Sequence, residues 1–204
     1  MAFYRRHLPH WHPEETWLFV TWRLAGSLPA SAIEIEVARE KPAGKAFAAL
    51  DRVLDHASHG PHWLKDSRVA GMVCQVIQQA DAARSLCLLG GYVVMSNHVH
   101  LLALPFAPAA RLTHWIKGTS ARSANRILNR TGMAFWQHES FDHWVRNSLE
   151  YERILHYIHH NPVRAGLVGS PEQWPWSSAA ARQAEACPTR ASAGRAGSTT
   201  PPPR

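Results

Sequence analysis

Two histidines separated by one residue are the first side chains in this sequence whose spacing could do chemistry. His98 and His100 lie inside an apolar stretch, GGYVVMSNHVHLLAL, which runs from Gly90 to Leu104. Side chains alternate between the two faces of an extended strand, so both imidazoles point to one face and could bind one metal ion. A sequence with 14 histidines also contains such pairs by chance, and the alternative is that both are ordinary strand residues.

A tyrosine and an asparagine form the second candidate set. Tyr157 and Asn161 are four residues apart in a segment that we expect to be helical, so they lie about 40° apart around its axis. One helix face therefore carries a hydroxyl group and an amide oxygen. Tyr151 lies about 240° away on the same helix, Tyr4 lies in the N-terminal segment and Tyr92 in an apolar strand. Only Tyr157 shares a face with a possible metal ligand, which makes it the candidate nucleophile.

These motifs resemble a known family. VVMSNHVHLL and YIHHNPVRAGLV are similar to the HUH single-strand endonucleases with one catalytic tyrosine, and specifically to the REP-associated tyrosine transposases, over roughly Trp11 to Ser178. The resemblance implies Mg²⁺ or Mn²⁺ held by His98, His100 and Asn161. It also implies that Tyr157 attacks DNA to give a 5′-phosphotyrosine intermediate and a free 3′ hydroxyl. Ser96 stands where relatives often have proline, and this departure removes no candidate group.

The resemblance favours an enzyme that cleaves and transfers single-stranded or hairpin DNA, with REP-like repeats as its partner, acting as a monomer or homodimer. A phenol with a pKa near 10 is about one part in a thousand ionised at pH 7, so the nucleophile needs a cation beside it. The alternative is a module that binds repeat or hairpin DNA without cutting it. A weaker third hypothesis is a metal-dependent hydrolase in which water attacks, which leaves Tyr157 without a role.

Periodicity predicts the elements that must position these groups. Aromatic and β-branched residues over 17–24 indicate a strand, and the histidine stretch indicates a hairpin that turns at Ser96-Asn97. Apolar residues at intervals of three and four indicate helices over 66–83 and 109–129. A further helix starts at Ser148 and should end near Asn161, before Pro162. Residues 45–56 also look helical, but the sequence assigns no role to the segment 30–60. We predict an α+β fold, an antiparallel sheet with helices packed on one face, of the ferredoxin-like or RRM-like kind that HUH endonucleases have.

The charge of the chain favours a polyanionic partner. Lys and Arg exceed Asp and Glu by 22 to 15, and the sequence pI is near 9.8. A basic stripe on the helix 109–129 and an aromatic and basic segment, FWQHESFDHWVRN, could contact phosphates and unpaired bases. The candidate DNA-binding residues are Lys117, Arg122, Arg126, Trp136, Arg146 and Arg164.

Composition also sets the expected domain limits. We predict one domain over 1–181 and a disordered tail rich in Ala, Pro and Arg over 182–204. The three cysteines include no CxxC pair and indicate no disulfide framework. No run of about 18 apolar residues and no signal peptide is evident, so we expect no membrane partner and a cytoplasmic, nucleoid-associated protein.

Overall fold

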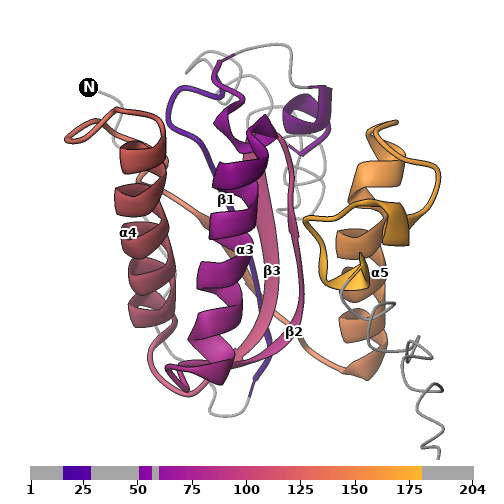
Figure 1. Ribbon diagram of the computed structural model, residues 1–204. Helices are drawn as coiled ribbons and strands as arrows, with labels where there is room; N and C mark the ends of the chain where they lie inside the picture. Colours follow the sequence, from indigo (N-terminus) through magenta and orange to yellow (C-terminus); the bar gives the residue numbers. More distant parts are fainter. Residues whose placement is uncertain (1–15, 29–50, 57–59, 181–204) are drawn as a thin grey trace, which may run out of the picture.

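The sheet at the centre of the fold has four antiparallel strands. The computed structural model describes residues 16–28, 51–56 and 60–180 (Figure 1). The strands lie in the order β2-β3-β1-β4, and every neighbouring pair is antiparallel. Their bounds are Leu18–Arg23 for β1, Cys87–Val94 for β2, His98–Pro105 for β3 and Phe141–Trp144 for β4. The histidine hairpin is therefore present as predicted, and its second strand, β3, is one of the two central strands.

Three long helices cover the sheet. The predicted helices are α3, Ser67–Ala82, α4, Ala109–Ile127, and α5, Ser148–Arg164, and short 3₁₀ turns span Trp63–Lys65 and Pro171–Gln173. Asp66 is the N-cap of α3, since its side chain accepts a hydrogen bond from the backbone N–H of Arg68. None of the helices in the described ranges is long and apolar enough to cross a membrane.

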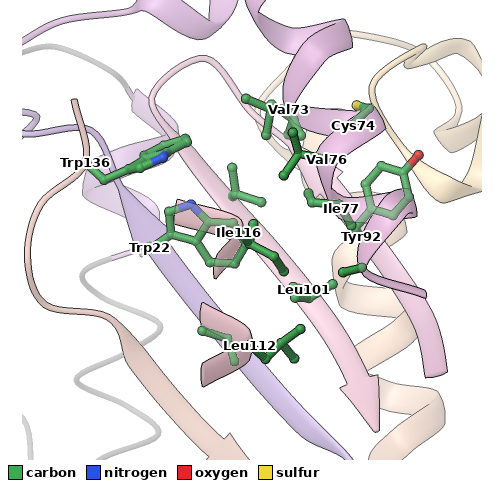
Figure 2. Packing of buried hydrophobic residues seen from close by; sticks show 14 of the residues in the cluster. Trp22, Val73, Cys74, Val76, Ile77, Tyr92, Leu101, Leu112, Ile116 and Trp136 are labelled. Carbon is green, nitrogen blue, oxygen red and sulfur yellow. The ribbon is translucent and has the colours of Figure 1, made fainter. Parts of the chain in front are cut away.

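The larger core lies between the sheet and the pair α3 and α4. Alternate residues of β1 and β3, such as Trp22 and Leu101, meet Val73 and Ile77 of α3 and Ile116 of α4 (Figure 2). The residues between them in the strands point to the opposite face, where Phe19, Val93 and Leu102 pack against Leu155 and Ile158. The helices therefore occupy both faces and not one face as predicted, because the strands are apolar on both. The pair α3 and α4 shares one face, and α5 covers the other.

A glycine pair lets α5 approach the sheet closely. β2 and β3 change register between Leu89 and Gly91. A Cβ atom on Gly91 would lie 2.5 Å from Cδ1 of Leu155, and one on Gly90 would lie 2.8 Å from the ring of Trp17. A larger residue at either position would push α5 away, so these glycines fix how near α5 comes to β2, which pairs with the strand that carries the histidines.

Two local expectations need correction. The helix α5 does not end at Asn161 but continues to Arg164 with Pro162 inside it. Proline removes only its own N–H, and the last turn is kept by hydrogen bonds such as that from the N–H of Ala165 to the carbonyl of Asn161, 3.0 Å. The sequence did not predict β4, which the pairing of Phe141–Trp144 with β1 creates. The predicted tail, 182–204, lies outside the described residues.

Candidate active site

The two histidines meet on the sheet face that α5 covers. His98 and His100 are fully buried at the start of β3, and their Nε2 atoms lie 3.2 Å apart. The spacing of two along the strand places both rings on the same face as Leu102, which packs against α5. The sequence prediction that both imidazoles share a face is therefore confirmed.

Hydrogen bonds fix the orientation of both imidazole rings. Asn97 donates from Nδ2 to the carbonyl of Leu54, 3.1 Å, so its Oδ1 is the atom that faces Nδ1 of His98 at 2.7 Å. An amide oxygen only accepts, so His98 carries its proton on Nδ1 and a lone pair on Nε2. His100 has Oγ1 of Thr21 at 2.7 Å from Nδ1, and Nδ2 of Asn161 donates to its Nε2 at 3.2 Å. Nε2 of His98 therefore presents a lone pair, as a ligating histidine requires, and Nε2 of His100 lies 3.2 Å from it.

The helix α5 brings the tyrosine to this point. The half-buried ring of Tyr157 lies edge-on to that of His100, with ring centroids 5.5 Å apart. Asn161, one turn later, is fully buried, and its Oδ1 has no hydrogen-bond partner among the described residues. A half-turn of the amide about its Cβ–Cγ bond would exchange Oδ1 and Nδ2 and direct the oxygen at the histidines. The structure therefore brings together His98, His100, Tyr157 and Asn161.

An acidic residue that the sequence did not single out completes the cluster. Asp51 is 1% exposed and accepts a hydrogen bond at Oδ2 from the hydroxyl of Tyr157. Its Oδ1 lies 3.2 Å from Nε2 of His100 and 3.7 Å from Nε2 of His98. The sequence feature that could have identified Asp51 is its spacing from Asp55. The two residues are four apart in a helical segment that also contains apolar Leu54, so both carboxylates lie on one helix face.

Burial sets the charges of these groups. Burial lowers the pKa of His98 to about 3, so its imidazole is neutral at physiological pH. Burial acts to raise the pKa of Asp51, but attraction to His100, a hydrogen bond with His100 and attraction to Arg164 outweigh it and keep this pKa below its usual value. Burial and the neighbouring Asp51 carboxylate raise the pKa of Asp55 to about 7. The site thus combines the neutral imidazole of His98 with the ionised carboxylate of Asp51.

The cluster has the chemistry of a metal site. Ligand atoms of Asp51, His98 and His100 all lie within 4.8 Å of one another. Two imidazole nitrogens and a carboxylate oxygen converge, and a cation between such ligand atoms would be attracted by all three. Nitrogen and oxygen ligands of this kind suit several divalent ions. These residues could therefore bind a metal ion.

Two of the predicted DNA-binding arginines lie on or beside α5. Arg164 is exposed, and its Cζ lies 4.9 Å from the centroid of the Tyr157 ring. Arg146 is also exposed but forms an ion pair with Glu150, with Nη2 2.7 Å from Oε1. Arg164 is thus placed at the tyrosine, whereas Arg146 already has an acidic partner.

The other basic candidates lie on α4, across the sheet from the tyrosine. Arg122 and Arg126 are exposed, and Arg122 lines a cavity of about 540 Å³ together with Arg84 and Arg111. Lys117 donates from Nζ to two backbone carbonyls, those of Gln137 and His138, at 2.8 and 2.9 Å. The ammonium group of Lys117 therefore holds the chain after α4 in place.

The expectation that Trp136 meets a DNA base needs correction. Its side chain is 8% exposed, it packs edge-on against Trp22 and Phe135, and its Nε1 donates to Oγ of Ser120 at 2.9 Å. Neither ring face has room for a base. Trp136 is therefore a residue of the larger core, and its polar N–H has a hydrogen-bond partner inside that core.

Comparisons with known proteins agree with this arrangement. The family model described as "Transposase IS200 like" matches residues 62–161, a range that includes the histidines, Tyr157 and Asn161. The chain is 26% identical over 92 residues to a REP-associated tyrosine transposase of Escherichia coli (strain K12), a match that covers 44% of this chain and 53% of that protein. The chain therefore spans about half the length of this curated relative.

A solved structure shares the fold. It is described as a REP-associated tyrosine transposase bound to a REP hairpin, and it matches with a TM-score of 0.55 and 19% identity over 100% of this chain and 98% of that chain. The predicted α+β fold class is confirmed by this neighbour. The resemblance to REP-associated tyrosine transposases that the motifs indicated is confirmed as well.

Proposed function

We propose that this chain, which resembles the REP-associated tyrosine transposases in motifs and fold, is a metal-dependent DNA endonuclease and strand-transferase that acts on single-stranded or hairpin DNA. The observation that carries the proposal is the placement of the Tyr157 ring beside His100, in a site where the Nε2 atoms of two buried imidazoles lie 3.2 Å apart. A protein that only binds DNA has no need for this costly burial of polar groups. The bound hairpin of the structural neighbour supports a hairpin partner here.

In the proposed reaction, Tyr157 is the nucleophile. Its Oη forms a bond to a backbone phosphorus, and the bond from that phosphorus to O3′ breaks. The phenol loses one proton, and the leaving 3′ oxygen gains one. The product is a 5′-phosphotyrosine and a 3′ hydroxyl. One phosphodiester is exchanged for another, so the reverse step can rejoin strands.

The ligands that we propose for the cation are His98, His100 and the amide oxygen of Asn161, with Mg²⁺ or Mn²⁺ as the ion. When bound, the ion supplies positive charge that offsets the charge developing on the attacked phosphate. The chain's own residues orient the imidazoles, His98 through Asn97 and His100 through Thr21, and bury both rings away from water. The site is therefore organised before DNA arrives.

Exposed arginines supply the proposed DNA contacts. Arg164 lies at the tyrosine and could meet the scissile phosphate, and Arg122 and Arg126 could meet phosphates farther along the DNA. Arg146 could join them once its contact with Glu150 is released, and Lys117 once it leaves the carbonyls that it now holds. The proposed partner is REP-like hairpin DNA, bound by a monomer or a homodimer.

The test uses labelled hairpin DNA taken from the flanks of the gene. The full chain is incubated with this DNA and Mn²⁺, and the products are separated on a denaturing gel. We expect a slow-migrating band that protease digestion converts to a short DNA-peptide, and a second fragment that ends in a 3′ hydroxyl. Tight binding with no covalent band at any metal concentration would instead favour a non-cleaving DNA-binding module.

A further inference from the structure

Asp51 contacts both the histidine pair and the tyrosine of the candidate site. We propose, on the basis of the function proposed above, that the Asp51 carboxylate bridges the cation and the nucleophile. In this arrangement Oδ1 binds the cation and Oδ2 holds the hydroxyl of Tyr157. Asp51 lies outside residues 62–161, the range that the family model matches, and its role follows from its contacts in this chain.

The two carboxylate oxygens face different partners. Oδ1 lies toward the imidazoles, 3.2 Å from Nε2 of His100 and 3.7 Å from Nε2 of His98. Oδ2 accepts the hydrogen bond from the Tyr157 hydroxyl, and Nδ2 of Asn161 lies 3.4 Å from it. One side chain therefore connects the proposed metal ligands with the proposed nucleophile.

The burial of Asp51 indicates a cation. The side chain is 0% exposed, and within the described residues both of its ion-pair contacts are with the two histidines, at Oδ1. A buried carboxylate is stable only when it is paired or coordinates a metal. A divalent cation between Oδ1 and the two imidazoles would stabilise this carboxylate and both ring nitrogens.

The fold fixes Asp51 at this position. The helical residues 51–56 are joined to the histidine hairpin by the hydrogen bond from Nδ2 of Asn97 to the carbonyl of Leu54, and Leu54 itself is buried. Asn97 also orients His98, so the same residue places the carboxylate and an imidazole. With Asp51 added, the ligand set has two nitrogens, one anionic oxygen and one amide oxygen, which suits Mn²⁺ or Mg²⁺ better than two nitrogens with a neutral oxygen do.

The test measures Mn²⁺ binding by the full chain without DNA, by electron paramagnetic resonance of the free ion. Asp51→Asn keeps the shape of the side chain and removes its charge, and we expect a loss of Mn²⁺ affinity of about 10- to 100-fold. Asp51→Ala should show at least the same loss, and circular dichroism verifies the folding of both. Asp142→Asn removes one exposed carboxylate on β4 and should stay within threefold of the unmodified chain.

A second readout separates positioning from metal binding. At saturating Mn²⁺, Asp51→Ala should still form the DNA adduct at least tenfold more slowly than the unmodified chain, because the carboxylate that accepts the hydrogen bond from the Tyr157 hydroxyl is then lost. Unchanged Mn²⁺ affinity in both Asp51 variants, or a larger loss in Asp55→Asn than in Asp51→Asn, would overturn the bridging role. Equal Mn²⁺ binding by the unmodified chain and by the double variant His98→Ala, His100→Ala would instead overturn the metal site of the proposed function.

Discussion

The guanidinium of Arg164 lies over the ring of Tyr157, with its Cζ 4.9 Å from the ring centroid. The two residues are seven apart, which is two turns of α5, so they share one face of the helix. The helix must continue past Pro162 to make this contact. A cation at this distance is within reach of a phosphate that the proposed nucleophile would attack.

We therefore expect Arg164→Gln to slow adduct formation about fivefold to tenfold at saturating DNA, since a partly exposed cation–π contact contributes about 1 kcal/mol. Single-turnover assays with labelled hairpin measure this rate. Arg153→Gln, which removes an exposed charge from the same helix, is the matched control and should leave the rate unchanged. Equal rates in both variants would show that Arg164 does not assist the nucleophile.

Tyr157→Phe should abolish the covalent DNA adduct while folding and hairpin binding are nearly kept. The change removes only the hydroxyl oxygen, and the ring still packs against Phe19 and His100. Tyr151→Phe, six residues earlier on α5, is the control and should form adduct normally. Mass spectrometry of the adduct identifies the modified tyrosine, and a DNA-peptide that contains Tyr151 instead would contradict the assignment.

Double replacement of His98 and His100 by alanine should lower the cleavage rate by at least a hundredfold and change hairpin affinity far less. The reason is that the cation acts on charge that develops only as the phosphodiester is attacked. Asn161→Ala should lower the cleavage rate less than the double replacement does, since a water can replace one neutral oxygen ligand. Gel-shift affinity and adduct yield are compared across a Mn²⁺ titration. Full-rate cleavage by the unmodified chain in the presence of a chelator would argue against a metal mechanism.

Hairpin binding should weaken steeply with salt, and Arg122→Gln with Arg126→Gln should reduce that dependence. Each phosphate contact that is lost lowers the slope of log affinity against log salt by roughly 0.9, so the double variant should lose between one and two units of slope. Fluorescence anisotropy with hairpin, single-stranded and blunt duplex DNA measures both quantities. The expected order places the hairpin and the single strand above the duplex, and equal affinity for all three would contradict the single-strand preference.

The ion pair of Glu150 and Arg146 predicts a pH dependence of stability. The hydrogen bond from Arg146 lowers the pKa of Glu150 to about 2, below the ordinary value of 4.5. A carboxylate with a lowered pKa in the folded state stabilises the fold above about pH 4.5 and loses that contribution as the pH falls toward 2. Glu150→Gln should therefore be less stable than the unmodified chain by about 0.5 to 1 kcal/mol at pH 6, and the difference should shrink at pH 3. Urea unfolding at the two pH values checks the sign.

The local parts of the fold and of the site could be read from the sequence. Alternation along a strand places His98 and His100 on one face, and helical spacing places Tyr157 and Asn161 on one face, because both depend only on backbone geometry. The N-cap Asp66 and the limits of α3 and α4 follow from the same local rules. These patterns were sufficient to predict the fold class and the resemblance that the comparisons confirmed.

Only the tertiary structure decided which distant groups meet these faces. The contact of Tyr157 with Asp51 joins residues 106 positions apart, and no periodicity in the sequence encodes it. The same holds for Trp136, whose aromatic ring suits a base or a core equally well until Trp22 and Ser120 surround it. Spacing along the chain determines the direction of a side chain, whereas its partners depend on how the sheet and α5 pack. The sequence by itself therefore determined the proposed nucleophile and its imidazoles, and packing alone placed a buried carboxylate between them.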